Sequence, residues 1–231
     1  MSNNKTNIKN VYAISDIHGC YKELLQLLRK LIITPETLII FMGDYVDRGP
    51  QSKEVIDLII SLREQCCVVT LKGNHEDMMY EALVNNSDRD VKMWMTNGGY
   101  QTLLSYGDIE TVLADIRELP EVLKRHLNFI KTLELYYETD THIFVHASPG
   151  LNTPINEQPE EHLIWRRPQS GDEEFDYNHL SGKTIVSGHT AQSNGVPRFL
   201  SDKNILIDTG CFFTGVLTAF DVNRNVFITN H

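Results

Sequence analysis

Five short apolar segments of this sequence are each followed by aspartate, asparagine or histidine, usually beside a glycine. These residues offer two carboxylates, one amide oxygen and three imidazoles: Asp16, His18, Asp44, Asn74, His146 and His189. This mixture suits borderline to hard divalent ions such as manganese, iron or zinc. Six ligands are too many for one ion that keeps an open coordination position. The set therefore predicts two ions that share a bridging carboxylate.

The stretch "GDYVDRG", at positions 43–49, adds groups that could act on a substrate. It places two aspartates and an arginine directly after the apolar run "TLIIFM". A surface salt bridge would explain these charges if they stood alone. Because four other apolar segments end in similar residues, we interpret the stretch as part of one chemical site. The planar guanidinium of Arg48 suits recognition of phosphate oxygens.

The segments that position these residues alternate regularly over the first third of the chain. Apolar segments typical of strands cover residues 11–15, 37–42 and 66–71. Segments with apolar residues at helical spacing cover 21–32, 52–64 and 76–84. Asp16 and Asp44 are 28 residues apart, which is about the length of one βαβ unit. We therefore expect a parallel sheet whose carboxyl edge collects the site residues.

The rest of the chain changes character twice. Strand patterns are missing from about 86–133, which we interpret as a helical insertion in a single domain spanning 1–231. After Leu135 short strand patterns return, with one hairpin in "LYYETDTHIFVHA" and another around the turn "VNRN". Parallel strands early and antiparallel strands late predict two sheets in one domain.

Composition narrows the classes of function. The 231 residues carry a formal net charge of −10, which disfavours binding to nucleic acid or to an anionic membrane surface. The N-terminus lacks the apolar core of a signal peptide, and no apolar run is long enough to cross a bilayer. The four cysteines form no CxxC pair. We expect a cytoplasmic protein, and the sequence gives no indication of its oligomeric state.

The order of these motifs resembles that of a known family. "SDIHG", "GDYVDRG", "GNHE", a strand followed by His146, and "SGHT" resemble the signature of the phosphoprotein phosphatase family of calcineurin-like metallophosphoesterases. The bacterial and phage branch, which includes lambda phosphatase, is similar also in "WMTNGGYQTLLSYG" and "IDTGCFFTGVLTAF". The resemblance implies an α/β fold: a four-layer α/β/β/α sandwich of two mixed β-sheets flanked by helices.

The resemblance also implies a role for each site residue. Asp16, His18 and Asp44 would hold the first metal ion. Asp44 would bridge to a second ion, which is held by Asn74, His146 and His189. The general acid would be His75, oriented by Asp47. Three basic residues would bind the substrate phosphate: Arg48, Arg167 and Lys72, the last where many relatives carry arginine.

The activity implied is hydrolysis of phosphoserine and phosphothreonine in proteins, extending to phosphotyrosine, through a hydroxide that bridges two manganese ions. Iron and zinc are alternative metals. Two other functions stay open: hydrolysis of diadenosine tetraphosphate, and binding of phosphoproteins without turnover. The complete ligand set argues against the last, and the small number of basic residues near the site argues against a polyphosphate.

The insertion contains two further side chains whose surroundings the sequence indicates. We expect Trp94 either to line a substrate groove or to anchor the core. His126 lies in a helical pattern, and we expect it at the surface or at its boundary.

Overall fold

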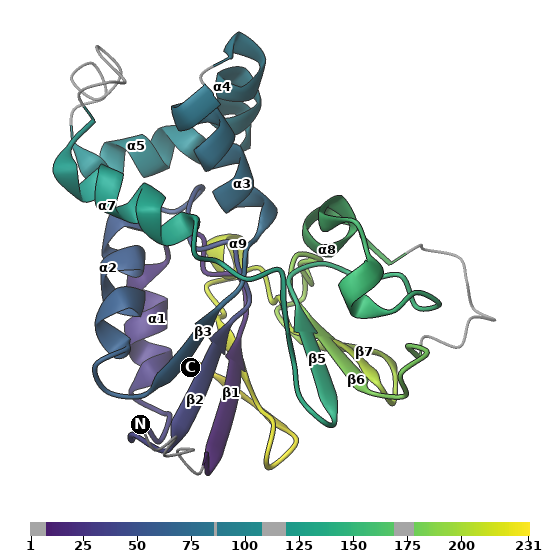
Figure 1. Ribbon diagram of the computed structural model, residues 1–231. Helices are drawn as coiled ribbons and strands as arrows, with labels where there is room; N and C mark the ends of the chain where they lie inside the picture. Colours follow the sequence, from purple (N-terminus) through teal and green to yellow (C-terminus); the bar gives the residue numbers. More distant parts are fainter. Residues whose placement is uncertain (1–7, 86, 108–118, 169–177) are drawn as a thin grey trace, which may run out of the picture.

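The strands form two five-stranded sheets in the computed structural model, which describes residues 8–85, 87–107, 119–168 and 178–231 (Figure 1). The first sheet has the order β10-β9-β1-β2-β3. Its strands are β1 (Asn10–Ile14), β2 (Thr37–Phe41), β3 (Cys67–Thr70), β9 (Thr218–Asp221) and β10 (Val226–Thr229). β1, β2 and β3 run parallel, as the βαβ pattern predicts. β9 and β10 add an antiparallel hairpin beside β1.

The second sheet has the order β4-β5-β6-β8-β7. Its strands are β4 (Tyr136–Glu138), β5 (His142–Val145), β6 (Thr184–Ser187), β7 (Arg198–Ser201) and β8 (Asn204–Leu206). The prediction that the late strands are antiparallel is wrong for β5, β6 and β8, which run parallel. The crossover from β5 to β6 contains the helix α8 (Glu160–Trp165), which is too short to show helical periodicity in the sequence.

Three buried clusters confirm the four-layer sandwich. On the outer face of the first sheet, Tyr12 and Ile14 of β1 pack with α1 (Tyr21–Leu28) and α2 (Ser52–Leu62). Ala13, between them, points the other way and packs against Phe144 of the second sheet. The outer face of the second sheet packs against Leu163 of α8. Two further short helices are η4 (Ile155–Glu157), which precedes α8, and α9 (Cys211–Thr214), which precedes β9.

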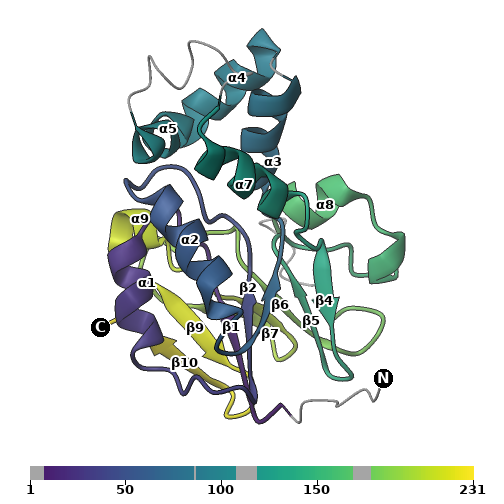
Figure 2. The same cartoon turned by 60° about the vertical axis from the view of Figure 1, so that its left-hand side comes forward.

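A group of helices lies beyond the strand ends (Figure 2). Its members are α3 (Asn74–Tyr80), η1 (Glu81–Asn85), α4 (Asp88–Trp94), η2 (Met95–Gly99), α5 (Tyr100–Tyr106) and α7 (Glu121–Ile130). Most described residues of the predicted insertion, 86–133, are thus helical, and residues 108–118 lie outside the described part. Trp94 and Leu103 join the cluster that contains α1 and α2. The division into a single domain stays a prediction.

His126 of α7 is buried, so the expectation of a surface position is wrong. Its Nδ1 atom lies 2.7 Å from the hydroxyl of Tyr106 on α5, and its Nε2 atom lies 3.0 Å from Asp57 on α2. The histidine therefore connects two helices of the insertion to a helix of the sandwich. In the described ranges no helix has the length and apolar character needed to cross a membrane.

Candidate metal centre

The predicted metal ligands all follow strand ends: five lie in loops, and Asn74 is the first residue of α3. Three of these strands, β1 to β3, belong to the first sheet, and two, β5 and β6, belong to the second. All six side chains are buried: Asp16, His18, Asp44, Asn74, His146 and His189. Segments that are distant in sequence thus return to one edge of the sandwich, as expected from strand ends in α/β folds.

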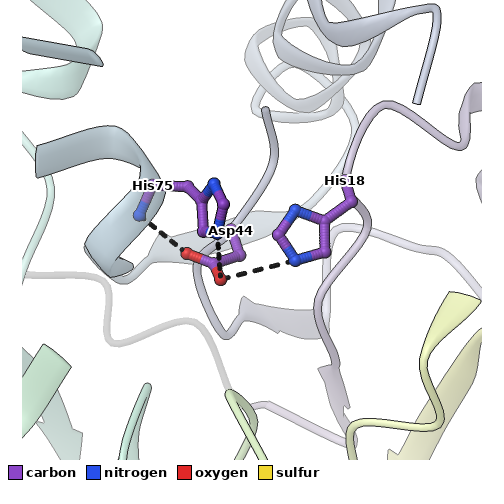
Figure 3. Close-up of side chains that lie close together, drawn as sticks. All are labelled: His18, Asp44 and His75. Carbon is purple, nitrogen blue, oxygen red and sulfur yellow. Dashed lines mark hydrogen bonds and ion pairs between the residues drawn. The ribbon is translucent and has the colours of Figure 1, made fainter. Parts of the chain in front are cut away.

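Asp44 lies at the centre of the site and contacts residues from both sheets. Its Oδ2 atom is 3.5 Å from Nε2 of His18 and 4.0 Å from Nε2 of His75 (Figure 3). Its Oδ1 atom is 3.5 Å from Nε2 of His146. Two groups of potential metal ligands share this carboxylate: one contains His18 and His75, and the other contains His146 and His189. This is the geometry expected of a carboxylate that bridges two ions.

Two predicted ligands, Asn74 and Asp16, are not members of these two groups. The amide oxygen of Asn74 is 3.1 Å from Nε2 of His146, so it can join the second group. Asp16 belongs to neither group among the described residues. Its carboxylate instead accepts the backbone N–H of His189, at 3.0 and 3.1 Å. The role of Asp16 as a metal ligand stays a prediction.

Backbone carbonyl groups orient three of the imidazoles. Nδ1 of His18 donates to the carbonyl of Val46 at 2.9 Å, and Nδ1 of His146 donates to that of Met42 at 2.8 Å. Nε2 of His189 donates to the carbonyl of Trp165 at 3.0 Å. A carbonyl can only accept, so the other nitrogen of each neutral ring carries a lone pair that could bind metal. Histidines that bind metal are commonly oriented in this way.

The buried carboxylates of the site lie close enough to repel one another. Burial and the negative charges of Asp208 and Asp44 raise the pKa of Asp16 well above its usual range. Burial and Asp44 also raise the pKa of Asp208, to about 6. Burial opposes ionisation of Asp44 too, but the surrounding histidines, led by His146, outweigh it and lower the pKa of Asp44. Buried anions require a nearby cation, and divalent ions would meet that need. The residues present therefore fit a metal centre.

His75 and Asp47 form the buried pair that the general-acid role requires. Nδ1 of His75 lies 2.7 Å from Oδ2 of Asp47. Burial lowers the pKa of His75, but the charges of Asp44 and Asp47 outweigh burial and raise it above its ordinary value. Asp47 is held in turn by Trp94, whose indole N–H donates to it, and by the hydroxyl of Thr102, which donates at 2.7 Å. Trp94 is thus an anchor of the core and does not line a groove.

Two of the three predicted phosphate-binding residues lie close to the metal ligands. Arg48 donates to Nε2 of His18 at 2.8 Å and to Nε2 of His75 at 3.0 Å. Arg167 is exposed, and its positive charge is one of the causes that, after burial, lower the pKa of His189 to about 3. Lys72 is different, because carboxylates on α3 and α8 already pair with it.

The backbone of the site is unusual. Six non-glycine residues in the described part of the chain have positive φ, and five of them are predicted site residues: His18, Asp44, Asp47, Arg48 and His189. Each such conformation costs on the order of 1–3 kcal/mol, and clusters of them mark functional sites. Gly73 is required for a different reason: a Cβ atom there would lie 2.1 Å from Oδ1 of Asp44.

Two buried acidic residues of this region have no role predicted from the sequence: Glu76 and Asp208. The carboxylate of Glu76 accepts backbone N–H groups of Asp44, Tyr45 and Gly73 at 2.7–3.0 Å, so it fixes the loop that carries the central aspartate. Asp208 follows β8 in "IDTG", which repeats the pattern of a strand, an acidic residue and a glycine. This repeated pattern could have identified Asp208 as a candidate site residue from the sequence alone.

Comparison with known proteins identifies the family. The family model for calcineurin-like phosphoesterases matches residues 9–193, which is most of the chain. The chain belongs to the calcineurin-like phosphoesterases. The matched range contains every predicted metal ligand. The bacterial serine/threonine phosphatases among the relatives support the narrower assignment to the phosphoprotein phosphatase family. Members of the calcineurin-like family use a dinuclear metal site, in agreement with the two ligand groups around Asp44.

Relatives of this phosphoesterase carry two kinds of name. It is 32% identical to bis(5'-nucleosyl)-tetraphosphatase PrpE [asymmetrical] of Anoxybacillus flavithermus, over 89% of this chain and 87% of that protein. It is 27% identical to serine/threonine-protein phosphatase 2 of Salmonella typhimurium, over 93% of both chains. Its fold is similar to the crystal structure of a candidate diadenosine tetraphosphatase, with a TM-score of 0.71 and 18% identity over 98% and 94% of the two chains.

Proposed function

We propose that this phosphoesterase removes phosphate from serine and threonine residues of proteins, with phosphotyrosine as a further substrate. The observation that supports this choice is the small number of basic groups that the described residues place near the ligand groups. Arg48 and Arg167 can meet a phosphoryl group, whereas Lys72 is already paired with two carboxylates. Two guanidinium groups and a metal centre suit one phosphomonoester better than a chain of four phosphates.

The metal centre would hold two divalent ions, which we propose to be manganese. His18 and Asp44 would bind one ion, and Asp44, Asn74, His146 and His189 would bind the other, with Asp16 as a further ligand. When bound, two such ions lower the pKa of a water molecule and neutralise phosphoryl oxygens. A cytoplasmic location is part of the proposal, and the four free cysteines support it.

The side chains of the protein then have distinct tasks. Arg48 would leave His18 and His75 to donate to the phosphoryl oxygens, where its planar guanidinium matches two oxygens. Its departure frees Nε2 of His75 to carry a proton. His75 would give this proton to the leaving serine or threonine oxygen, while Asp47 stabilises the charged imidazole.

Hydrolysis of dinucleoside tetraphosphates is the second candidate function. The names of the PrpE relatives and of the candidate tetraphosphatase structure favour it. Binding of phosphoproteins without turnover is a third possibility, and the intact pair of His75 and Asp47 argues against it.

A direct comparison of substrates tests the proposal. Enzyme freed of metal by chelation and reloaded with manganese would be assayed on phosphoserine, phosphothreonine and phosphotyrosine peptides and on diadenosine tetraphosphate. We expect kcat/KM to be higher for the phosphoserine and phosphothreonine peptides than for the dinucleotide. The reverse order would establish the second candidate. Binding of phosphopeptides without turnover, in a sample with verified metal content, would establish the third.

A further inference from the structure

A groove of about 740 Å³ lies between the helical insertion and α8. Residues of α3, η1 and α4 line one wall, and residues of α8 line the other. In Figure 1, α3 and α4 lie on one side and α8 lies on the other. One end of the groove lies beside the metal centre. The predicted ligand Asn74 is the first residue of α3, which forms part of one wall. Trp165, which lines the opposite wall, is the last residue of α8. The ring of Trp165 is 6.4 Å from that of His189, between centroids. A substrate at the metal centre would therefore extend into this groove.

The groove is strongly acidic. Five carboxylates and one ammonium group line it, and the ammonium group belongs to Lys72. Lys72 lies 2.5 Å from Asp77 of α3 and 2.7 Å from Glu160 of α8, so it joins carboxylates of both walls. Lys72 is thus an example, within the protein itself, of a cationic side chain held between carboxylates of the two walls.

Three further carboxylates of the groove carry a charge that no cation of the described residues neutralises, although Glu81 and Asp90 accept hydrogen bonds from Asn85 and Ser87. Within the described residues, no ion pair connects Glu81, Asp90 or Glu161 to a basic side chain. Apolar side chains lie between them, including Met93, which is 41% exposed, and Trp165. Methionine adapts its shape to different partners, and a tryptophan face attracts guanidinium and ammonium groups. The lining therefore matches a flexible chain that carries both basic and apolar side chains.

We propose that this groove selects phosphoproteins in which lysine or arginine, together with apolar residues, flank the phosphorylated residue. This inference rests on the proposed protein phosphatase function and specifies its substrate class. The same charges disfavour a polyphosphate, because phosphates that extend from the metal centre into the groove would meet Glu81 and Glu161. Like charges placed together in a binding site reduce affinity for the wrong partner.

Three phosphothreonine peptides that differ only in their flanking residues test the inference: arginine, glutamine or glutamate on both sides. For the manganese-loaded enzyme we expect kcat/KM to be roughly tenfold higher for the arginine peptide than for the glutamate peptide, because several carboxylates act together. The preference should shrink in high salt, which screens exposed charges.

Two matched charge reversals locate the effect. Glu161→Lys changes the groove, and Glu64→Lys makes the same change at an exposed residue after α2. We expect Glu161→Lys to reduce the preference severalfold, and Glu64→Lys to preserve it. Because p-nitrophenyl phosphate does not reach into the groove, its hydrolysis by each variant is the reference against which the change in peptide preference is measured.

The outcomes separate this inference from the function on which it rests. Equal kcat/KM for the three peptides, all above diadenosine tetraphosphate, would reject the groove and leave the protein phosphatase intact. A preference for arginine that Glu161→Lys does not alter would also reject the groove. Higher kcat/KM for the dinucleotide than for every peptide would reject both proposals.

Discussion

The indole N–H of Trp94 donates to both carboxylate oxygens of Asp47, at 2.9 and 3.1 Å. Both side chains are buried, and Asp47 in turn holds the imidazole of His75. A residue of the helical insertion is therefore connected through one carboxylate to His75, the proposed general acid. The insertion thus supports the proposed catalytic residues, and its helix α4 contributes to one wall of the groove.

Trp94→Phe keeps an aromatic ring in the core and removes this donor. A hydrogen bond to a charged group contributes about 1.5–3 kcal/mol, so we expect kcat on a phosphoserine peptide to fall by roughly tenfold. KM should change little, because Trp94 does not line the substrate groove. The loss on p-nitrophenyl phosphate should be smaller, since that leaving group scarcely needs a proton. Equal losses on both substrates would show that Trp94 acts only through packing.

His75→Asn tests the general acid itself. The loss of a general acid lowers rates by roughly 10²–10⁴-fold, and we expect a reduction of this size in kcat on phosphoserine peptides. The effect on p-nitrophenyl phosphate should again be smaller. Asp47→Asn should produce a milder form of the same defect, because His75 remains but loses its charged partner. A uniform loss across both leaving groups would mean that His75 positions the substrate.

Asp44→Asn should weaken both metal sites at once, because Asp44 is the residue shared by the two ligand groups. We expect the metal content after dialysis against dilute chelator to fall for both ions, together with activity. Asp140→Asn, at an exposed position, is the control with the same loss of charge. Retention of two ions per chain by the Asp44 variant, measured by elemental analysis, would contradict the bridging role.

Glu76→Gln should destabilise the fold around the metal centre. Both carboxylate oxygens of Glu76 accept backbone N–H groups, so a glutamine would direct its NH₂ group at donors. A buried donor without an acceptor costs about 1–3 kcal/mol, and we expect the free energy of unfolding to fall by at least this much. Glu81→Gln, on the adjoining helix η1, is the matched control. Equal unfolding midpoints in urea for the two variants would refute this role.

The sequence could predict that the candidate ligands lie together because its signals are local. Each ligand follows a strand and stands near a glycine, so strand periodicity and βαβ length place the ligands at one edge. Contacts between distant segments were not predictable in this way. Lys72 pairs with nearby Asp77 but also with Glu160, which is 88 residues away, and no local pattern indicates this second partner. The parallel second sheet was missed for a similar reason, since its crossover helix has only six residues.

The buried His126 should make stability depend on pH. Burial lowers the pKa of His126 below its ordinary value, which is about 6.5. Between these two values the unfolded chain binds a proton that the folded protein does not, so stability falls as the pH drops below about 6.5. The geometry agrees, because the Tyr106 hydroxyl can donate to Nδ1 only while that nitrogen is unprotonated.

One group of this kind changes the free energy of unfolding by at most about 1.4 kcal/mol per pH unit. We expect His126→Gln to be less stable than the wild type at pH 7.5, but to lose less further stability between pH 7.5 and 5.5. Urea unfolding in the presence of chelator measures the two slopes without a contribution from metal binding. His162→Gln, at an exposed position, should retain the wild-type slope. A His126→Gln slope as steep as the wild-type slope would show that other buried histidines cause the acid sensitivity.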